Sequence, residues 1–272
     1  MDKKLYKNKE WLETQIKEIG YKEIIGRSIG VSGDTIHRWC KKYGIETPKM
    51  PSIRRKATFN LHFFETIDTE EKAYWLGFLM ADGCVSKSGR LSIILKNDDI
   101  EHLRKFSKSL ELQNTDIIEK NITDKRGFVT TRAEVRINSV ELCQSLEKYG
   151  IVCNKTGKEI MSSNIPKELK RHFIRGFFDG DGSICKVYKR QYNRIHLGSC
   201  SLSIIQDIIE NVFQETQIEL KYYISNSYSR PFYYIDCTHK QHCKDFIKYL
   251  YNDCNIYLDR KYKLAQETIG AQ

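Results

Sequence analysis

The chain has 272 residues, of which 40% are apolar, so it can form a small domain and a larger one, each with its own core. Its net charge is +10, and residues 1–58 alone carry 14 basic against 7 acidic side chains, which fits a polyanionic partner as well as plain solubility. No apolar run approaches the ~20 residues that a membrane span needs, so we expect no membrane partner.

Residues 8–44 are expected to form three short helices, the third over residues 34–43. Ser32 is placed to cap this third helix, directly after a turn that contains Gly30. The pattern resembles a helix-turn-helix unit, whose second helix of the pair enters the major groove of DNA. The alternative is a three-helix bundle with a solvated basic face; the charge excess favours DNA binding. The residues expected to contact DNA are Ser32, Thr35, Arg38, Lys41 and Lys42.

Residues 46–68 are predicted to form a basic linker that follows this module of residues 1–45. Pro48 and Pro51 interrupt regular structure there. Arg54 and Arg55 belong to a basic run suited to following DNA phosphates, although a solvated linker explains them nearly as well.

Two later stretches, residues 75–83 and 174–182, share one pattern. In each, a Gly stands five residues before an Asp, a small residue directly before that Asp and a Gly directly after it. On a helix the two small residues, four positions apart, fall on one face and let two helix backbones approach closely. The small residues expected in this helix seam are Gly77, Ala81, Gly176 and Gly180.

Such packing would bring together Asp82 and Asp181, which lie 99 positions apart in the sequence, where both helices end. A helix C-terminus carries partial negative charge, so two carboxylates there repel each other unless a cation lies between them. Oxygen ligands suit Mg²⁺, or Mn²⁺ in its place. We therefore predict a metal site formed by both carboxylates and the carbonyl groups of Ala81 and Gly180. A single helix of this kind would be ordinary core; its duplication favours the site.

The same order of elements follows each of these helices, which indicates a tandem duplication over residues 69–165 and 166–272. The expected fold class is α+β: two αββαββα repeats whose antiparallel sheets form a pseudo-twofold saddle. The segments after the last helices also match, residues 154–156 with residues 259–261. The first repeat is predicted to have helices at 69–82, 98–112 and 139–149, and strands at 84–85, 91–95, 117–122 and 128–137. The second is predicted to have helices at 170–181, 202–216 and 241–251, and strands at 183–188, 194–200, 218–225 and 232–236.

The two stretches resemble the LAGLIDADG motif of homing endonucleases, in the single-chain form with two motifs, over roughly residues 71–265. Met80 departs from the motif where the second copy keeps Asp179. The resemblance implies a monomeric endonuclease that uses a divalent metal to hydrolyse both strands of a long asymmetric DNA site, leaving short 3′ overhangs. It also implies Asp82 and Asp181 as the metal-binding acids. A basic residue from each sheet is implied as well, for which the candidates are Lys96 and either Lys240 or His239.

Polar and apolar residues alternate along the predicted strands, so each sheet should have one solvated face that fits a DNA groove. The alternative is an ordinary half-solvated antiparallel sheet. The residues expected on the DNA face are Arg132, Arg136, Arg194, His196 and Lys221.

Two other functions remain open: a DNA-binding transcription regulator that kept the fold and lost cleavage, and an RNA maturase. The presence of both Asp82 and Asp181 favours the enzyme. With Met first, Gln last and no self-splicing junction residues, a free-standing protein is favoured over an intein.

Nine scattered cysteines without a CxxC pair are typical of reduced thiols, so we expect a cytoplasmic protein, associated with the nucleoid if bacterial or phage. One group is close in sequence: Cys237, His239, His242 and Cys243. Its spacing matches no tetrahedral zinc pattern, so we predict no metal site there.

Overall fold

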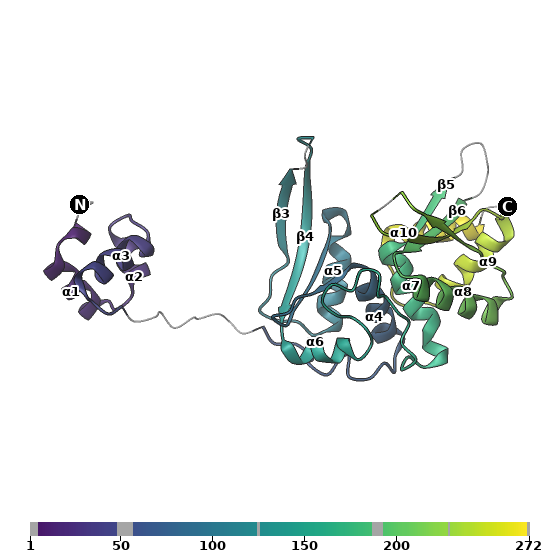
Figure 1. Ribbon diagram of the computed structural model, residues 1–272, viewed down its shortest axis with the longest axis horizontal. Coiled ribbons are helices and arrows are strands. Elements are labelled where there is room, and N and C mark those ends of the chain that lie inside the picture. The colour runs from purple at the N-terminus through teal and green to yellow at the C-terminus, as the bar shows by residue number, and fades with distance from the viewer. Residues whose placement is uncertain (1–4, 48–56, 124–125, 187–192, 228, 271–272) are drawn as a thin grey trace. The chain divides into compact units, whose positions relative to one another are not determined.

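The computed structural model describes residues 5–47, 57–123, 126–186, 193–227 and 229–270. The chain divides into two compact units, Met1–Arg55 and Lys56–Gln272, both drawn in Figure 1. Arg54 and Arg55 lie outside the described residues. Among the described helices, none combines the length and apolar character needed to cross a membrane.

The first unit is helical, and its core consists of Leu12, Ile25, Ile29, Ile36 and Cys40. The predicted N-terminal cap of its last helix is present, because the Thr35 amide donates to Ser32 Oγ at 3.2 Å. The helix ends at Gly44, whose φ of 68° is left-handed. Its elements are η1 (Leu5–Lys7), α1 (Lys9–Glu18), α2 (Lys22–Ser28) and α3 (Gly33–Tyr43).

The second unit contains two repeats, each with a four-stranded antiparallel sheet, which confirms the predicted α+β class and the order of elements. The sheet orders are β1-β2-β4-β3 and β5-β6-β8-β7. The first repeat comprises α4 (Glu70–Asp82), β1 (Gly83–Val85), β2 (Arg90–Lys96), η2 (Asn97–Asp99), α5 (Ile100–Ser109), β3 (Ile118–Thr123), β4 (Val129–Asn138) and α6 (Val140–Glu147). The second comprises η3 (Lys167–Leu169), α7 (Lys170–Asp181), β5 (Ser183–Lys186), β6 (Asn193–Ser199), α8 (Leu202–Thr216), β7 (Tyr222–Ser225), β8 (Phe232–Cys237), α9 (Lys240–Tyr251) and α10 (Asp259–Gly270).

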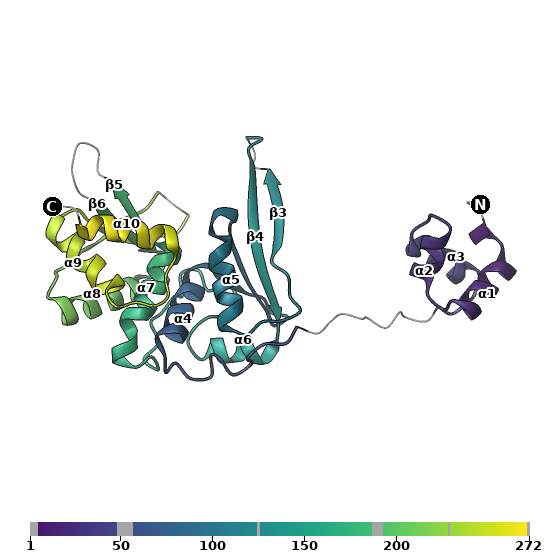
Figure 2. The same cartoon turned by 180° about the vertical axis from the view of Figure 1, so that it is seen from behind.

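Three elements differ clearly from the sequence prediction. Strand β7 begins at Tyr222, whereas the predicted strand begins at residue 218. Helix α5 spans ten residues rather than fifteen: it follows the short η2, and Glu111, just after its end, has a left-handed φ of 53°. Helix α10 was not predicted, because the matching segment of the first repeat has no helix. It packs against α9 and β5 (Figure 2), and Ala265 and Thr268 are buried, so tertiary contacts rather than duplication determine its structure.

Helices α4 and α7 pack at backbone contact in the centre of the second unit. A Cβ atom placed on Gly77 would lie 1.9 Å from the carbonyl oxygen of Phe173. One placed on Gly176 would lie 1.9 Å from the carbonyl oxygen of Tyr74. Neither position can hold a side chain while the helices stay this close, which explains glycine in the middle of two helices.

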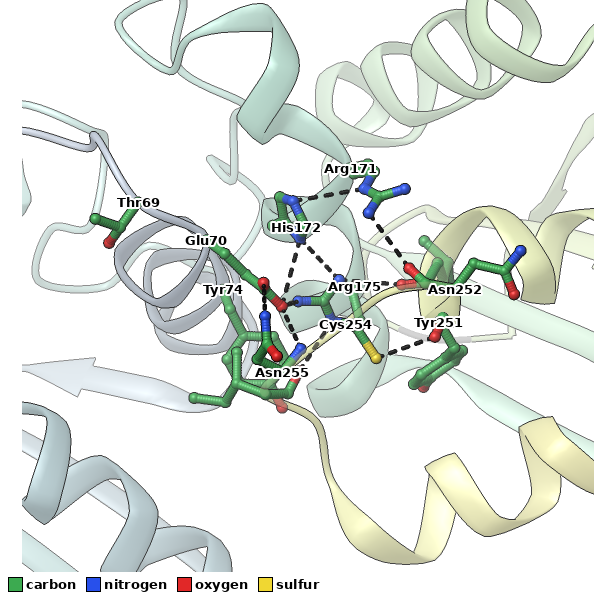
Figure 3. A network of polar contacts seen from close by, with 12 residues as sticks. Thr69, Glu70, Tyr74, Arg171, His172, Arg175, Tyr251, Asn252, Cys254 and Asn255 are labelled. Atoms are coloured by element: carbon green, nitrogen blue, oxygen red, sulfur yellow. Dashed lines mark hydrogen bonds and ion pairs between the residues drawn. The ribbon is translucent and has the colours of Figure 1, made fainter.

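A polar clamp joins the repeats near the N-terminal end of α4 (Figure 3). Its centre is Arg175, which is 0% exposed and donates to Glu70 Oε1 at 2.7 Å. Arg175 also donates to the Ile256 and Leu250 carbonyls at 3.0 and 3.1 Å. The backbone and side-chain amides of Asn255 donate to the two Glu70 oxygens at 2.8 and 2.9 Å. The buried guanidinium is therefore paired, and one carboxylate of the first repeat holds two segments of the second.

Candidate active site

Asp82 and Asp181 are the last residues of α4 and α7, so the close helix packing places both at one end of the seam. Each helix ends on a glycine, and the Gly182 amide donates to the Phe178 carbonyl at 2.8 Å. A Cβ atom placed on Gly180 would lie 3.4 Å from Asp82 Oδ2. The carboxylate of the first repeat thus lies against the last turn of the second motif helix.

The two carboxylates act on each other. Burial, and after it the negative charge of Asp82, raise the pKa of Asp181 to about 6. Burial also raises the pKa of Asp82. Asp181 has protein on most sides yet keeps an exposed face, so water screens part of this effect and a ligand can reach it.

Two lysines donate to the ends of the same helices. Lys155 Nζ donates to the Ala81 carbonyl at 2.8 Å. Lys261 Nζ donates to the Phe178 and Asp179 carbonyls, both at 2.7 Å, and to the Gly180 carbonyl at 3.4 Å. Lys155 follows α6 and Lys261 follows α9, the matching helices of the two repeats, so the arrangement repeats the duplication. The ammonium groups meet the negative ends of the helix dipoles.

These lysines also provide much of the positive charge at the carboxylate pair. The charges of Lys155 and Lys261 both lower the pKa of Asp82 and of Asp181 and so oppose the effect of burial. Burial lowers the pKa of Lys155, and it lowers that of Lys261 to about 8. Four ionisable groups therefore share one small region with their charges balanced against each other.

Beneath Lys261 lies a buried hydrogen-bond chain around Asp179. This carboxylate accepts from Tyr74 Oη at 2.7 Å, Tyr251 Oη at 2.5 Å and the Leu258 amide at 2.8 Å. Because Tyr74 donates its only proton to Asp179, the Nε2–H of His102 must donate to Tyr74 Oη across the 3.0 Å contact between them. Burial raises the pKa of Asp179, whereas the charge of Lys261 and the hydrogen bonds lower it. The first repeat has Met80 at the matching position, so the two halves of the site differ.

The oxygen atoms at this end of the seam fit a hard divalent cation. In the described parts of the chain, no group of three or more His, Cys, Asp or Glu side chains could hold a metal. Mg²⁺, however, often takes one or two carboxylates and keeps several waters. The Ala81 and Gly180 carbonyls each accept one lysine hydrogen bond and retain a second lone pair. Asp82, Asp181 and these two carbonyls therefore suit Mg²⁺ or Mn²⁺ better than a softer metal.

The basic residues predicted for the site, Lys96 and Lys240, lie at the ends of a strand and a helix. Lys96 is the last residue of β2, directly opposite Arg132, and Lys240 is the first residue of α9. Neither is among the charges that act most strongly on the pKa of the two carboxylates. A role for them stays a prediction, as does a role for His239, the N-cap of α9.

Sequence reasoning missed Lys155 and Lys261, although the signal was present. The segments after the last helix of each repeat were matched, but with Lys155 opposite Arg260. In the structure Lys261 makes the equivalent contact, one residue later. Arg260 instead donates from Nε to both Asp99 oxygens at 3.0 Å, joining α10 to the first repeat.

Within the described residues, those predicted to contact DNA occupy solvent-accessible positions. In α3, Arg38, Lys41 and Lys42 are exposed, and Ser32 and Thr35 form the N-terminal cap. On the sheets, Arg132 and Arg136 share the face of β4 opposite its buried apolar residues. Arg194 and His196 do the same on β6, and Lys221 directly precedes β7.

The cysteine and histidine group forms a local contact at the start of α9. Cys237 Sγ and Cys243 Sγ lie 3.4 Å apart, and the rings of His239 and His242 lie 4.4 Å apart. The Cys243 thiol donates to Cys237 Sγ.

Comparisons with known proteins identify a family that matches part of the chain and a solved structure of similar fold. A family described as LAGLIDADG-like domain matches residues 168–251. The replication factor C small subunit of Methanocaldococcus jannaschii is 31% identical over 193 residues, which cover 64% of this chain and 10% of that protein. The tRNA-splicing ligase RtcB of Pyrococcus furiosus is 25% identical over 193 residues, covering 63% of this chain and 20% of that protein. The chain spans a tenth and a fifth of the length of these two relatives, so their activities are not evidence for its own.

Among solved structures, the homing endonuclease I-WcaI bound to its DNA recognition sequence is similar. It aligns with a TM-score of 0.52 and 12% identity, over 72% of this chain and 87% of that one. This likeness concerns the fold. Residues 168–251 therefore form a LAGLIDADG-like domain, and the chain has the two-repeat LAGLIDADG fold of a homing endonuclease.

Proposed function

We propose that this chain is a site-specific endonuclease that hydrolyses both strands of duplex DNA with Mg²⁺ or Mn²⁺. One observation carries the proposal: Asp82 and Asp181 meet at the end of a backbone-contact helix seam, beside Lys155 and Lys261. A purely structural role does not explain two carboxylates of raised pKa next to the buried Lys261 and the half-buried Lys155. The fold shared with a DNA-bound homing endonuclease supports the proposal.

Asp82 and Asp181, with the carbonyls of Ala81 and Gly180, are the groups that would hold the metal. Bound there, the ion would supply an activated water and stabilise the charge that develops on the leaving 3′ oxygen. Lys155 and Lys261 are fixed by helix carbonyls, so their ammonium groups keep their place without substrate. They offset the charge that a phosphodiester adds to a site already containing two carboxylates.

The solvent-accessible sheet faces beside this site would bind the duplex, as a monomer on a long asymmetric sequence. The basic face of α3 would contact DNA beyond them, because the N-terminal unit carries much of the excess charge. A tether that joins two binding units raises the effective concentration of the second and lengthens the recognised site.

A DNA-binding regulator of the same fold is the second candidate, and one observation favours it. Lys155 and Lys261 already offset the negative charge of the carboxylate pair. The folded protein can therefore hold the two carboxylates close together without a metal ion. Asp82 and Asp181 would then be inherited remnants.

The test compares binding with cleavage in single-residue variants. Asp181→Asn should abolish cleavage and leave DNA affinity within about threefold, since it removes a metal-binding oxygen but no sheet contact. Cleavage by this variant at the wild-type rate would remove the site assignment.

A second comparison decides which basic residues take part. Lys155→Met should lower kcat by at least about a hundredfold, the loss typical of one charge-stabilising donor. Lys96→Met and Lys240→Met, the matched changes at the sheet-borne candidates, should weaken binding at most. The opposite ranking would return the role to Lys96 and Lys240.

A further inference from the structure

The outer faces of the two sheets, turned away from the helices, differ in chemistry. On the first sheet, the described strands β2, β3 and β4 carry five cations and one acid on this face. They are Arg90, Lys96, Lys120, Arg132, Arg136 and Glu134. On the second sheet, the described strands β5 to β8 carry one cation on this face, Arg194, and one acid, Asp236, which form an ion pair at 3.8 Å. One further exposed cation, Lys221, directly precedes β7.

The cations of the first sheet form a row across three strands. Lys96 lies directly opposite Arg132, and Arg132 lies directly opposite Lys120. Like charges in directly opposed positions destabilise a sheet. A row of three is expected where a polyanion neutralises it. Glu134 pairs with Arg136 and, at 3.5 Å, with Lys120, so it orients two of the long side chains.

The outer face of the second sheet is formed mainly by aromatic rings, whereas the charged residues of the first sheet lie beside exposed Ile94, Ile118 and Ile122. The rings of His196 and Tyr234 lie 5.1 Å apart, and those of Tyr234 and Tyr223 lie 5.7 Å apart. Phe232 stacks on Tyr234 at 6.4 Å and lies over Gly198, where an added Cβ would come within 2.4 Å of the Phe232 ring. Burial lowers the pKa of His196, so its imidazole adds no charge at neutral pH. The result is a neutral patch of rings from three strands.

We propose that the two sheets read chemically different half-sites. The first reads a half with guanines through Lys96, Arg132 and Arg136; the second reads an A·T-rich half through ring contacts with thymine methyl groups. Arg and Lys pair with guanine O6 and N7 in the major groove, whereas the thymine C5-methyl is recognised by apolar contact. This inference rests on the proposed DNA function and specifies the substrate of the same site.

The proposal also predicts that the two sheets contribute differently to the salt dependence of DNA affinity. Cations that meet phosphates release counterions, so they account for the salt dependence of affinity, at about 0.9 in the logarithmic slope for each phosphate neutralised. Rings release none. Substitution of Arg90 or Lys120, the first-sheet cations not assigned to guanine, should therefore reduce the salt slope, and substitutions among the rings of the second sheet should leave it unchanged.

The test is site selection from randomised duplex DNA by the full chain carrying Asp82→Asn and Asp181→Asn, which separates binding from cleavage. We expect an enriched site with G·C pairs toward one end and A·T pairs toward the other. Arg132→Ala in this background should relax preference at the G·C end only. Tyr223→Ser should relax preference at the A·T end only. The matched controls, Lys186→Ala and Ile224→Ser, lie on the opposite faces of their strands and should change neither end.

A substitution made in the DNA tests the same contacts and leaves the fold of the protein unaltered. Replacing thymine by uracil removes only the C5-methyl group, and in the A·T half it should weaken binding several-fold, with no effect in the G·C half. Half-sites of equal composition, or tyrosine and uracil substitutions without effect, would overturn the inference while leaving the endonuclease intact. A chain that enriches no duplex at all would instead remove the proposed DNA function, and this inference with it.

Discussion

At the scale of single residues, lysine and aspartate side chains of opposite charge lie together where the two motif helices end. Lys261 is 2% exposed and Asp179 is 1% exposed, and the ammonium group donates to the carbonyl of the same Asp179 residue. A buried ion retains its charge only if its partners remain in place. Asp179 therefore supports Lys261 from below, while Asp82 and Asp181 face the open side of the site.

Lys261→Met should destabilise the protein by about 3 kcal/mol, because it leaves the buried Asp179 carboxylate without its cation. Adding Asp179→Asn should recover at least about 1 kcal/mol, since the two residues are coupled. Urea unfolding of both single variants and the double variant measures this coupling. Lys263→Met, an exposed change on the same helix, is the control. Additive effects of the two substitutions would show that the pair is not coupled.

Asp181 should make metal-free stability depend on pH. Its pKa rises from 3.8 to about 6 in the folded protein, so the folded state binds this proton more tightly than the unfolded state. Stability is therefore fully present below about pH 4 and is lost as pH rises through about 6. In Asp181→Asn this loss disappears, and with solvent screening we expect a gain over wild type of about 1 kcal/mol at pH 7.

Urea unfolding in EDTA at pH 4.5 and pH 7 measures the effect of Asp181, with the exposed Asp116→Asn as control. A wild type that loses no stability relative to Asp181→Asn between these two pH values would contradict the proposed environment of this carboxylate.

At the scale of elements, the centre of the protein is a contact between two helix backbones. Sequence alone predicted it, because small residues four apart recur in both motif stretches and nothing else explains glycine within apolar helices. The bounds of α7 and α8 were also predicted, since strong apolar periodicity and a following Gly or polar turn define them. Helix α10 could not be predicted, because its stability comes from α9 and β5 rather than from its own pattern.

Gly176→Ala should destabilise the protein by about 3 kcal/mol, since the new methyl group would meet the Tyr74 carbonyl at 1.9 Å and force the helices apart. Gly270→Ala is a matched control, because this glycine is also helical and has no neighbouring atom within 4 Å of an added Cβ. The control should stay within about 0.5 kcal/mol of wild type. Thermal unfolding of both variants gives the comparison, and equal melting temperatures would argue against the close packing.

At the scale of the whole molecule, the chain combines a small helical unit with a two-repeat unit, each with a separate core. The charge distribution and the duplicated pattern made both foreseeable. The lysines of the site were not, because they lie 73 and 80 positions after the aspartates they accompany, on segments without a motif. Such contacts depend on how the last helix of each repeat returns to the seam, which periodicity does not encode.

Deletion of residues 1–45 should shorten the protected DNA footprint and reduce the salt dependence of affinity, while cleavage remains. The deleted residues supply cations but none of the groups at the helix seam. Footprinting of the full and shortened proteins tests this. A footprint of unchanged length would remove the DNA role of the N-terminal unit.

The most direct test of the central claim is incubation of the full chain with a randomised duplex library in Mg²⁺, beside metal-free and Ca²⁺ controls, followed by sequencing of all ends. The account predicts discrete ends with short 3′ overhangs in Mg²⁺ only, absent from the variant carrying Asp82→Asn and Asp181→Asn. Enriched bound sequences without new ends under any metal, or identical ends from that variant, would contradict it.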